Sequence, residues 1–330
     1  MSRDAFMRIA LSLARRNLGQ TWPNPSVGAL VVKDNHIIGE GYTARGGRPH
    51  AETEALQQTG PQARGATLYV TLEPCSHHGK TPPCTDAIIN AGASTVVIAC
   101  GDPNPQVNGQ GIVQLKKAGI EVIEHVCEKE AIELNRGFFS TIQKKRPYVA
   151  LKIATSLDGK IAGGKTRWIT GEQARNFGHL LRSQYDAIAT GIGTVLADDP
   201  LLNCRLTGLE DRSPVRVLFD RKNRLPKDSQ LAKTSNDIPL WIMQSPLPEA
   251  MQELAQKGIT RLLVEAGQQL STAFLHSGLV DRIYWFRAPL VIGDEGLAAF
   301  SEALPTQWKQ IERRFLGIDN LEIYECSPAS

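Results

Sequence analysis

The stretch His50-Ala51-Glu52, followed by Pro74-Cys75 and then Cys84, is the part of the sequence that decides the fold of its first half. One imidazole and two thiolates can bind Zn²⁺ and leave a fourth coordination position for water, the open arrangement of catalytic zinc. The metal lowers the pKa of that water, so hydroxide is present near neutral pH. Glu52 would be a carboxylate beside the metal that takes the proton of the water and passes it to a leaving amine. We therefore predict His50, Cys75 and Cys84 as metal ligands and Glu52 as the catalytic residue.

The order His-x-Glu, Pro-Cys and a further Cys is the general signature of zinc deaminases. In the signature two residues separate the cysteines, whereas here the segment Ser76–Pro83 lies between them. Structural zinc sites favour close cysteine pairs and a fourth protein ligand. A structural zinc site with His77 or His78 as the fourth ligand is therefore one alternative, and three unrelated buried residues are another.

Length and composition indicate an ordinary globular protein with two domains. The chain has 330 residues, of which 42% are hydrophobic and 22% charged. Single hydrophobic cores rarely grow beyond about 250–300 residues. No apolar run approaches the ~18 residues of a membrane span, and the segment after Met1 is amphipathic, unlike a signal peptide. Six cysteines in a chain of this length do not form a disulfide scaffold, so we expect a cytoplasmic protein.

The charge distribution argues against a nucleic-acid partner. The formal net charge is only +3, too small for a nucleic-acid-binding surface. The local basic run Lys144-Lys145-Arg146 is read as a solvated linker. We place a domain boundary there, between residues 1–145 and 146–330.

Strands and helices alternate in the first half. Apolar residues recur at helical spacing from Ala5 to Leu13, and Lys33-Asp34-Asn35 separates two strand-like runs, 28–32 and 36–41, as the turn of a hairpin. Further strands are expected at 67–72 and 95–100, and helices at 50–56, 85–90 and 112–118. This alternation predicts a three-layer αβα sandwich.

The second half shows a similar alternation and predicts a second α/β domain. Strands are expected at 148–154, 187–190, 215–219, 240–243, 261–264 and 282–292, and helices at 171–182, 248–256 and 269–275. The segment 194–205 carries Asp198, Asp199 and Arg205, and we expect a loop there because Pro200 breaks helices. The Arg205 guanidinium suits a phosphate, although a chance surface ion pair is an equal alternative. The run Val264-Glu265-Ala266-Gly267 passes from a strand through a glycine turn into a helix, whose N-terminus can bind an anion.

Together these segments resemble the bifunctional deaminase/reductase family of riboflavin biosynthesis over nearly the whole chain. In the first half the resemblance is carried by Pro23-Asn24-Pro25-x-Val27-Gly28, His50-Ala51-Glu52, the run from Thr71 to Cys84, and Asp102-Pro103-Asn104-Pro105. The long segment between the cysteines is this family's own variant. In the second half it is carried by Ser156-Leu157-Asp158-Gly159, Trp168-Ile169-Thr170, the run from Thr194 to Pro200, and Val264-Glu265-Ala266-Gly267.

The resemblance implies a cytidine-deaminase-like first domain and a second domain like dihydrofolate reductase. Residues 1–145 would be a zinc-dependent pyrimidine deaminase and residues 146–330 an NADPH-dependent reductase. The first would hydrolyse the 2-amino group of 2,5-diamino-6-(5-phosphoribosylamino)pyrimidin-4-one. The second would reduce the ribosyl side chain to give 5-amino-6-(5-phosphoribitylamino)uracil. Such an enzyme needs one Zn²⁺ per chain and NADPH, and we expect a homodimer or higher homo-oligomer.

The resemblance also implies site residues. The deaminase substrate would contact Asn24, His77, Lys80, Asp102 and Asn104. The reductase substrate would contact Thr166, Arg182, Leu202, Arg205 and Glu265. NADPH would contact Ala154, Trp168, Thr194, Asp198, Arg221, Gly267, Gln268, Gln269, Leu270, Ser271, Thr272 and Ala273.

Two other functions are considered. A zinc deaminase of nucleosides or of a tRNA base would need a flipped-base pocket with a strongly basic rim, which the small net charge argues against. A non-catalytic, zinc-stabilised nucleotide-binding module would have no use for Glu52 beside the metal.

Overall fold

The computed structural model describes residues 1–77, 82–105, 107–163, 168–302 and 308–326. The chain forms two compact units, Met1–Lys145 and Arg146–Ser330. Each unit is described by itself.

The first unit is built on a five-stranded sheet with the order β2-β1-β3-β4-β5. The strands are β1 (Gly28–Lys33), β2 (His36–Tyr42), β3 (Thr67–Val70), β4 (Thr95–Ile98) and β5 (Glu121–Ile123). The helices are α1 (Arg3–Arg15), α2 (Ala51–Thr59), α3 (Cys84–Ala91), α4 (Gln110–Lys117), α5 (Glu128–Leu134) and α6 (Arg136–Lys144). Short 3-10 turns are η1 (Arg45–Gly47) and η2 (Gly60–Ala63). Strands β3, β4 and β5 run parallel, while β1 is antiparallel to both β2 and β3.

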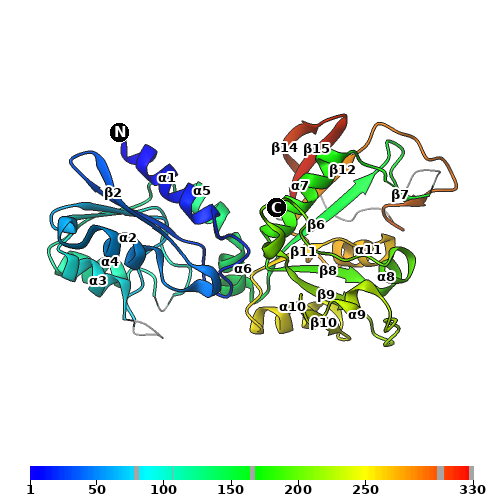
Figure 1. Cartoon of the computed structure of the whole chain (residues 1–330), viewed down its shortest axis with the longest axis horizontal. Helices are drawn as coiled ribbons and strands as arrows, with labels where there is room; N and C mark the ends of the chain where they lie inside the picture. Colours follow the sequence, from blue (N-terminus) through cyan, green and yellow to red (C-terminus); the bar gives the residue numbers. More distant parts are fainter. Residues whose placement is uncertain (78–81, 106, 164–167, 303–307, 327–330) are drawn as a thin grey trace. The chain divides into compact units, whose positions relative to one another are not determined.

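Two glycines let helices approach opposite faces of this sheet. A Cβ on Gly28 would lie 2.0 Å from the carbonyl oxygen of Ala10 in α1, and a Cβ on Gly41 would lie 2.1 Å from that of Ala51 in α2. Gly41 pairs with Ala29, the neighbour of Gly28, so the two glycines face opposite sides of the pleated sheet. Figure 1 shows α1 and α5 on one side of the sheet and α2, α3 and α4 on the other. The predicted three-layer αβα sandwich is confirmed.

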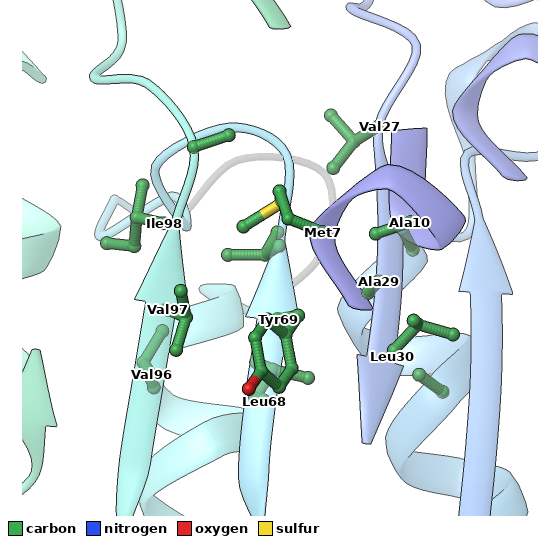
Figure 2. Close-up of a cluster of buried hydrophobic side chains, with 14 of the residues drawn as sticks. Met7, Ala10, Val27, Ala29, Leu30, Leu68, Tyr69, Val96, Val97 and Ile98 are labelled. Atoms are coloured by element: carbon green, nitrogen blue, oxygen red, sulfur yellow. The ribbon is translucent and has the colours of Figure 1, made fainter. Parts of the chain in front are cut away.

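One part of the core of this unit lies between α1 and the central strands. Met7 and Ala10 of α1 are fully buried and lie over Leu30, Tyr69 and Val97 (Figure 2). The predicted hairpin is also present, since Asp34 and Asn35 take the left-handed backbone conformation between β1 and β2. Turns of this kind are typical of two-residue hairpin loops.

The second unit contains an eight-stranded sheet with the order β10-β9-β8-β11-β6-β12-β15-β14. Its strands are β6 (Tyr148–Thr155), β8 (Ala187–Gly191), β9 (Val215–Phe219), β10 (Leu240–Met243), β11 (Arg261–Val264), β12 (Arg282–Arg287), β14 (Trp308–Leu316) and β15 (Asp319–Cys326). A separate small sheet pairs β7 (Lys160–Ala162) with β13 (Leu297–Ala298). The helices are α7 (Glu172–Ser183), α8 (Ile192–Asp198), α9 (Gln230–Lys233), α10 (Leu247–Gln256) and α11 (Gln268–His276), with a 3-10 turn η3 (Glu210–Arg212).

The first six strands of that order are mutually parallel, and β15 and β14 are antiparallel to their neighbours. The carboxyl ends of parallel strands meet at one edge of a sheet, where ligands bind in open α/β folds. Helix α7 covers one face through Ala174 and Leu181, which pack with Ala150 of β6 and Phe286 of β12. The predicted α/β architecture of this half is confirmed.

The structure corrects several local predictions. The segment expected as a loop from Thr194 begins inside helix α8, which ends at Asp198; Asp199 then takes the left-handed conformation just before Pro200. Pro200 therefore determines where helix α8 ends but does not prevent a helix before it. The strand expected to reach Ile292 ends at Arg287.

The basic run at the boundary is not a simple solvated linker. Arg146 forms a bidentate pair with Asp281, at 2.6 and 2.8 Å, and its side chain is mostly buried. Among the described residues, no helix is long and apolar enough to cross a membrane.

Candidate functional site

The predicted zinc ligands come from a strand end and two helix starts. His50 is the N-cap of α2, and Glu52 lies in the first turn of that helix. Cys75 follows β3 after a short segment, and Cys84 is the first residue of α3. Because helix N-termini carry partial positive charge, they favour the thiolate form that metal binding requires.

The three ligand atoms lie at the spacing of a tetrahedral metal site. His50 Nδ1 is 3.3 Å from Cys84 Sγ and 3.8 Å from Cys75 Sγ. All three atoms lie within 4.8 Å of one another. With zinc bonds of about 2.3 Å to sulfur and 2.0 Å to nitrogen, a sulfur and a nitrogen ligand lie roughly 3.5 Å apart. The residues therefore fit Zn²⁺.

The alternative fourth ligands do not join this group where they are described. His77 is exposed and its ring atoms are not part of the cluster. His78 lies outside the described residues. The geometry therefore favours three protein ligands and an open position for water, as in catalytic zinc sites.

The two cysteine thiols affect each other's pKa. The hydrogen bond from Cys84, together with His50, lowers the pKa of Cys75 to about 4 against the opposing effect of burial. The same contact and burial raise the pKa of Cys84. Zinc binds both cysteines as thiolates, so metal binding is linked to deprotonation of the two thiols.

Glu52 is the buried carboxyl beside this centre. It is 4% exposed. Burial, as the largest effect, raises its pKa, while His50 opposes the rise. A carboxyl with a raised pKa can both accept and donate a proton near neutral pH, as an acid–base catalyst must.

In the second unit, three charged side chains meet where parallel strands end. Arg182 of α7 donates to both carboxylate oxygens of Glu265, at 2.7 and 2.9 Å. Lys152 Nζ, from β6, lies 3.5 Å from the same carboxylate. Burial alone would raise the pKa of Glu265, but Arg182 and then Lys152 outweigh it and hold the value at about 2. Glu265 is therefore a permanent anion at neutral pH.

The segment after α8 is hydrogen-bonded to α7 beside the charged trio of Lys152, Arg182 and Glu265. Arg182 donates to the carbonyl of Asn203 at 3.0 Å, and the backbone N–H of Arg205 donates to His179 Nδ1 at 3.3 Å. The Arg205 side chain is exposed and donates to Asn203 Oδ1 at 2.6 Å. Leu202 is buried and takes a left-handed conformation, φ +52°. Arg182, Arg205 and Glu265 are thus brought together, whereas Leu202 belongs to an apolar cluster with Ile192 and Leu218. Thr166 lies outside the described residues.

Comparison with known proteins covers both units. Residues 1–100 match the cytidine and deoxycytidylate deaminase zinc-binding region, and residues 147–321 match the RibD C-terminal domain. The riboflavin biosynthesis protein RibD of Aquifex aeolicus is 43% identical over 93% of this chain and 94% of its own. That of Escherichia coli is 40% identical over 97% and 98%.

The chain belongs to the RibD family.

Solved RibD structures have the same fold. The Acinetobacter baumannii RibD structure matches with a TM-score of 0.90 at 40% identity, covering 98% of both chains. The Thermotoga maritima structure described as a diaminohydroxyphosphoribosylaminopyrimidine deaminase/5-amino-6-(5-phosphoribosylamino)uracil reductase matches with 0.90 at 39% identity and the same coverage. The chain is accordingly a bifunctional deaminase and reductase of riboflavin biosynthesis that uses Zn²⁺ and NADPH, and its substrate is a small pyrimidine.

Four of the five RibD deaminase substrate residues predicted from sequence are described. Asn24 packs against Gly47, where a Cβ would come within 1.9 Å of Asn24 Nδ2. Asp102 and Asn104 follow β4, and the Asn104 N–H donates to Asp102 Oδ1 at 2.8 Å. Burial raises the pKa of the Asp102 carboxyl, while His77 is near enough to lower it in part. Lys80 lies outside the described residues.

The predicted RibD cofactor residues gather around two helix starts. Gly267 N–H donates to Thr194 Oγ1 at 3.1 Å, which joins α8 to the turn before α11. A Cβ on Gly191 would lie 3.3 Å from Leu270. Gln268, Gln269 and Leu270 open helix α11, so their N–H groups precede the first intrahelical bond and can face a phosphate.

The remaining predicted cofactor residues differ in accessibility. Ala154 is half-buried on β6, whereas Asp198, Arg221 and Ala273 are exposed. Trp168 is 54% exposed, with the Arg175 guanidinium 5.2 Å above its ring. Ser271 and Thr272 are buried, and their hydroxyls donate to the carbonyls of Ala266 and Gln268. Contact of any of the predicted residues with NADPH stays a prediction.

Sequence reasoning missed Lys152, His179 and Glu73. Lys152 had a signal, because it is the one charged residue in the otherwise apolar run 148–154. His179 lies one turn before Arg182 on α7 and has no such signal. Glu73 was quoted only as part of the run before Cys75, and only the structure shows what its carboxylate binds.

Proposed function

We propose that residues 1–145 hydrolyse the 2-amino group of 2,5-diamino-6-(5-phosphoribosylamino)pyrimidin-4-one, and that residues 146–330 then reduce the ribosyl side chain with NADPH. The final product is 5-amino-6-(5-phosphoribitylamino)uracil. The observation that carries the first step is the grouping of His50, Cys75 and Cys84 beside the buried carboxyl of Glu52. The anion at Glu265, held between Arg182 and Lys152 where parallel strands end, supports the second.

In the deaminase, His50, Cys75 and Cys84 would hold the zinc, which supplies a water of lowered pKa. Glu52 would take one proton from the water that adds to the carbon bearing the amino group and pass it to the ring nitrogen. It would then move the remaining proton from the new hydroxyl to the amine, so that the C–N bond breaks, ammonia leaves and the carbonyl forms. Asn24, His77, Lys80, Asp102 and Asn104 are proposed to hold the pyrimidine and its phosphoribosyl group.

In the reductase, NADPH supplies the hydride, and the protein orients the two reactants. Arg205 is proposed to bind the substrate phosphate, because its exposed guanidinium is fixed by Asn203 and by the backbone contact to His179. Glu265, Arg182, Leu202 and Thr166 are proposed to face the ribosyl group. The start of α11, together with Thr194, Asp198 and Arg221, is proposed to contact NADPH.

We further propose a cytoplasmic homo-oligomer. The edge strand β14 leaves its outer backbone groups available for a second chain. Phe315 on that strand is 69% exposed and Ile318 beside it 74%. Exposed apolar groups of this kind favour association. Light scattering of the wild type and of Phe315→Glu tests the proposal, and a wild-type monomer would contradict it.

Separate measurement of the two half-reactions tests the main proposal. Zinc content is measured on the purified protein, ammonia is measured with the diaminopyrimidinone alone, and NADPH oxidation is followed after ammonia release. We expect one zinc per chain, ammonia without NADPH, and NADPH oxidation that depends on prior deamination. NADPH oxidation that precedes ammonia release would contradict the proposed order.

A further inference from the structure

Glu73 is a buried carboxylate directly beside the zinc-binding segment. It lies two residues before Cys75 and is 3% exposed. Its Oε2 accepts from the backbone N–H groups of Gly109, at 3.0 Å, and Asp102, at 3.4 Å. Its Oε1 accepts from those of Gly111, at 3.0 Å, and Ile112, at 3.4 Å. One side chain therefore binds both ends of the loop from Asp102 to Gly109 and the first turn of α4.

These contacts provide hydrogen-bond partners for both oxygens of the buried carboxyl group. Backbone N–H groups at a helix N-terminus stabilise an anion, and α4 begins at Gln110. A buried carboxyl group that accepts several such bonds holds its donors in a fixed arrangement. The helix start also packs closely on this segment, since a Cβ on Gly111 would lie 2.3 Å from the carbonyl oxygen of Pro74.

A second connection joins α4 to the other cysteine ligand. Gln114 Oε1 accepts from Thr85 Oγ1 at 2.9 Å, and Gln114 Nε2 donates to Asp86 Oδ1 at 2.8 Å. Thr85 follows Cys84 directly, and its N–H donates to the carbonyl of Cys75 at 3.2 Å. Helix α4 is therefore bonded to the segments that carry both cysteines.

We infer that Glu73 is a positioning residue of the deaminase, which fixes Asp102 and Asn104 relative to the zinc ligand Cys75. The inference rests on the proposed function of the loop that carries those two residues. The Asp102 N–H donates to Glu73, and the Asn104 N–H donates to Asp102 Oδ1 at 2.8 Å. Glu73 therefore fixes Asp102 directly and Asn104 through Asp102. Glu73 acts through the loop and does not itself touch the reacting atoms.

The variant Glu73→Gln tests this role. It keeps the side-chain volume but turns an amide NH₂ toward backbone donors. We expect the KM for the diaminopyrimidinone to rise about tenfold or more, as for loss of hydrogen bonds to a charged group. The kcat should change little, zinc should stay at one per chain, and NADPH oxidation with the deaminated product should be unchanged. Glu130→Gln on α5, whose side chain is 44% exposed, is the matched control.

A double-mutant cycle separates positioning from simple stabilisation. If Glu73 acts through the loop, Glu73→Gln should raise KM much less in an Asn104→Ala background than in the wild type. Additive effects would overturn the inference, as would a wild-type KM or loss of zinc in Glu73→Gln. If Glu73→Gln does not fold, Glu73→Asp is measured in its place. A raised KM would support the positioning role, and a wild-type KM would overturn it.

The same experiment distinguishes the two levels of proposal. A wild-type KM in Asn104→Ala would show that the proposed role of the loop is wrong, and the inference would fall with it. A raised KM in Asn104→Ala together with a wild-type KM in the Glu73 variants would remove only the positioning role.

Discussion

The zinc centre and the charged trio of the reductase hold buried charge in different ways. In the zinc centre, His50, Cys75 and Cys84 lie within 35 residues of sequence and leave compensation of the thiolates to a metal. In the reductase, Lys152, Arg182 and Glu265 come from three separate elements and compensate one another. A site of the first kind depends on its metal and on one nearby acid–base group. A site of the second kind depends on every member, because removing one leaves its partners buried and unpaired.

The largest expected effect is at Glu52. Glu52→Gln keeps the volume and the metal ligands but removes the proton carrier. Deamination should fall by about 10²–10⁴. Zinc content and NADPH oxidation with the deaminated product should hold. Ammonia release and metal analysis check this.

The matched control is Glu54→Gln on the same helix, whose carboxylate accepts from the Tyr42 N–H at 3.1 Å. It should keep deamination near the wild-type rate. If Glu52→Gln abolished both activities in a folded, zinc-loaded protein, a shared site would have to replace two separate ones.

At Glu265 we expect the reductase, and not the deaminase, to be affected. Glu265→Gln leaves Arg182 and Lys152 without their anion, so the second unit should lose about 3–5 kcal/mol of unfolding free energy and its reductase activity. Urea unfolding and NADPH oxidation measure the two losses. Glu312→Gln, on the exposed strand β14, is the control. A variant of wild-type stability would show that the trio is not a mutually dependent network.

A smaller effect is expected at Arg205, at the exposed edge of the trio. Arg205→Ala should raise the reductase KM by about 10–100-fold, as for loss of one charge-assisted contact. Deamination should be unchanged, and Arg313→Ala on β14 should leave both activities as they are. An unchanged reductase KM would make Arg205 an ordinary surface residue.

The smallest effect is a pH dependence of stability. The pKa of Glu265 is held at about 2, below its ordinary value of 4.5. The trio therefore contributes its full stability above about pH 4.5, and this contribution is lost as the pH falls toward 2. Loss of zinc in acid affects the wild type and Glu265→Gln alike. In thermal unfolding, the difference in melting temperature between the wild type and Glu265→Gln should be present at about pH 5.5 and become smaller toward pH 3. A constant difference would contradict the assignment.

The sequence predicted those features that depend on short spacings. The hairpin at Asp34–Asn35 and the turn before α11 are each set by neighbouring residues. The metal ligands were predicted from their sequence motif, although the fold is what brings His50 to the two cysteines. Lys152 and Glu265 are different, because their contact depends on β11 pairing with β6 in a register that places Val264 opposite Leu151. That register follows from packing of the whole sheet and cannot be read from either segment alone.

The failed loop prediction has a comparable cause. Pro200 excludes a helix only at its own position and over the residues just before it. The chain ends α8 at Asp198, and the left-handed Asp199 turns the backbone away. The role of Arg205, which was carried over from the family resemblance, stays a prediction, whereas Lys152 and His179 were found only from their contacts.

The close contact between Gly41 and α2 has a consequence for variation in this enzyme. Ala51, whose carbonyl oxygen lies 2.1 Å from where a Cβ on Gly41 would stand, separates the metal ligand His50 from the proton carrier Glu52. A methyl group added to a buried strand would shift the peptide that links the two functional groups. Variants at Gly41 should therefore show an altered zinc affinity before the fold is lost. A position with no chemistry of its own thus limits how far His50 and Glu52 can be displaced.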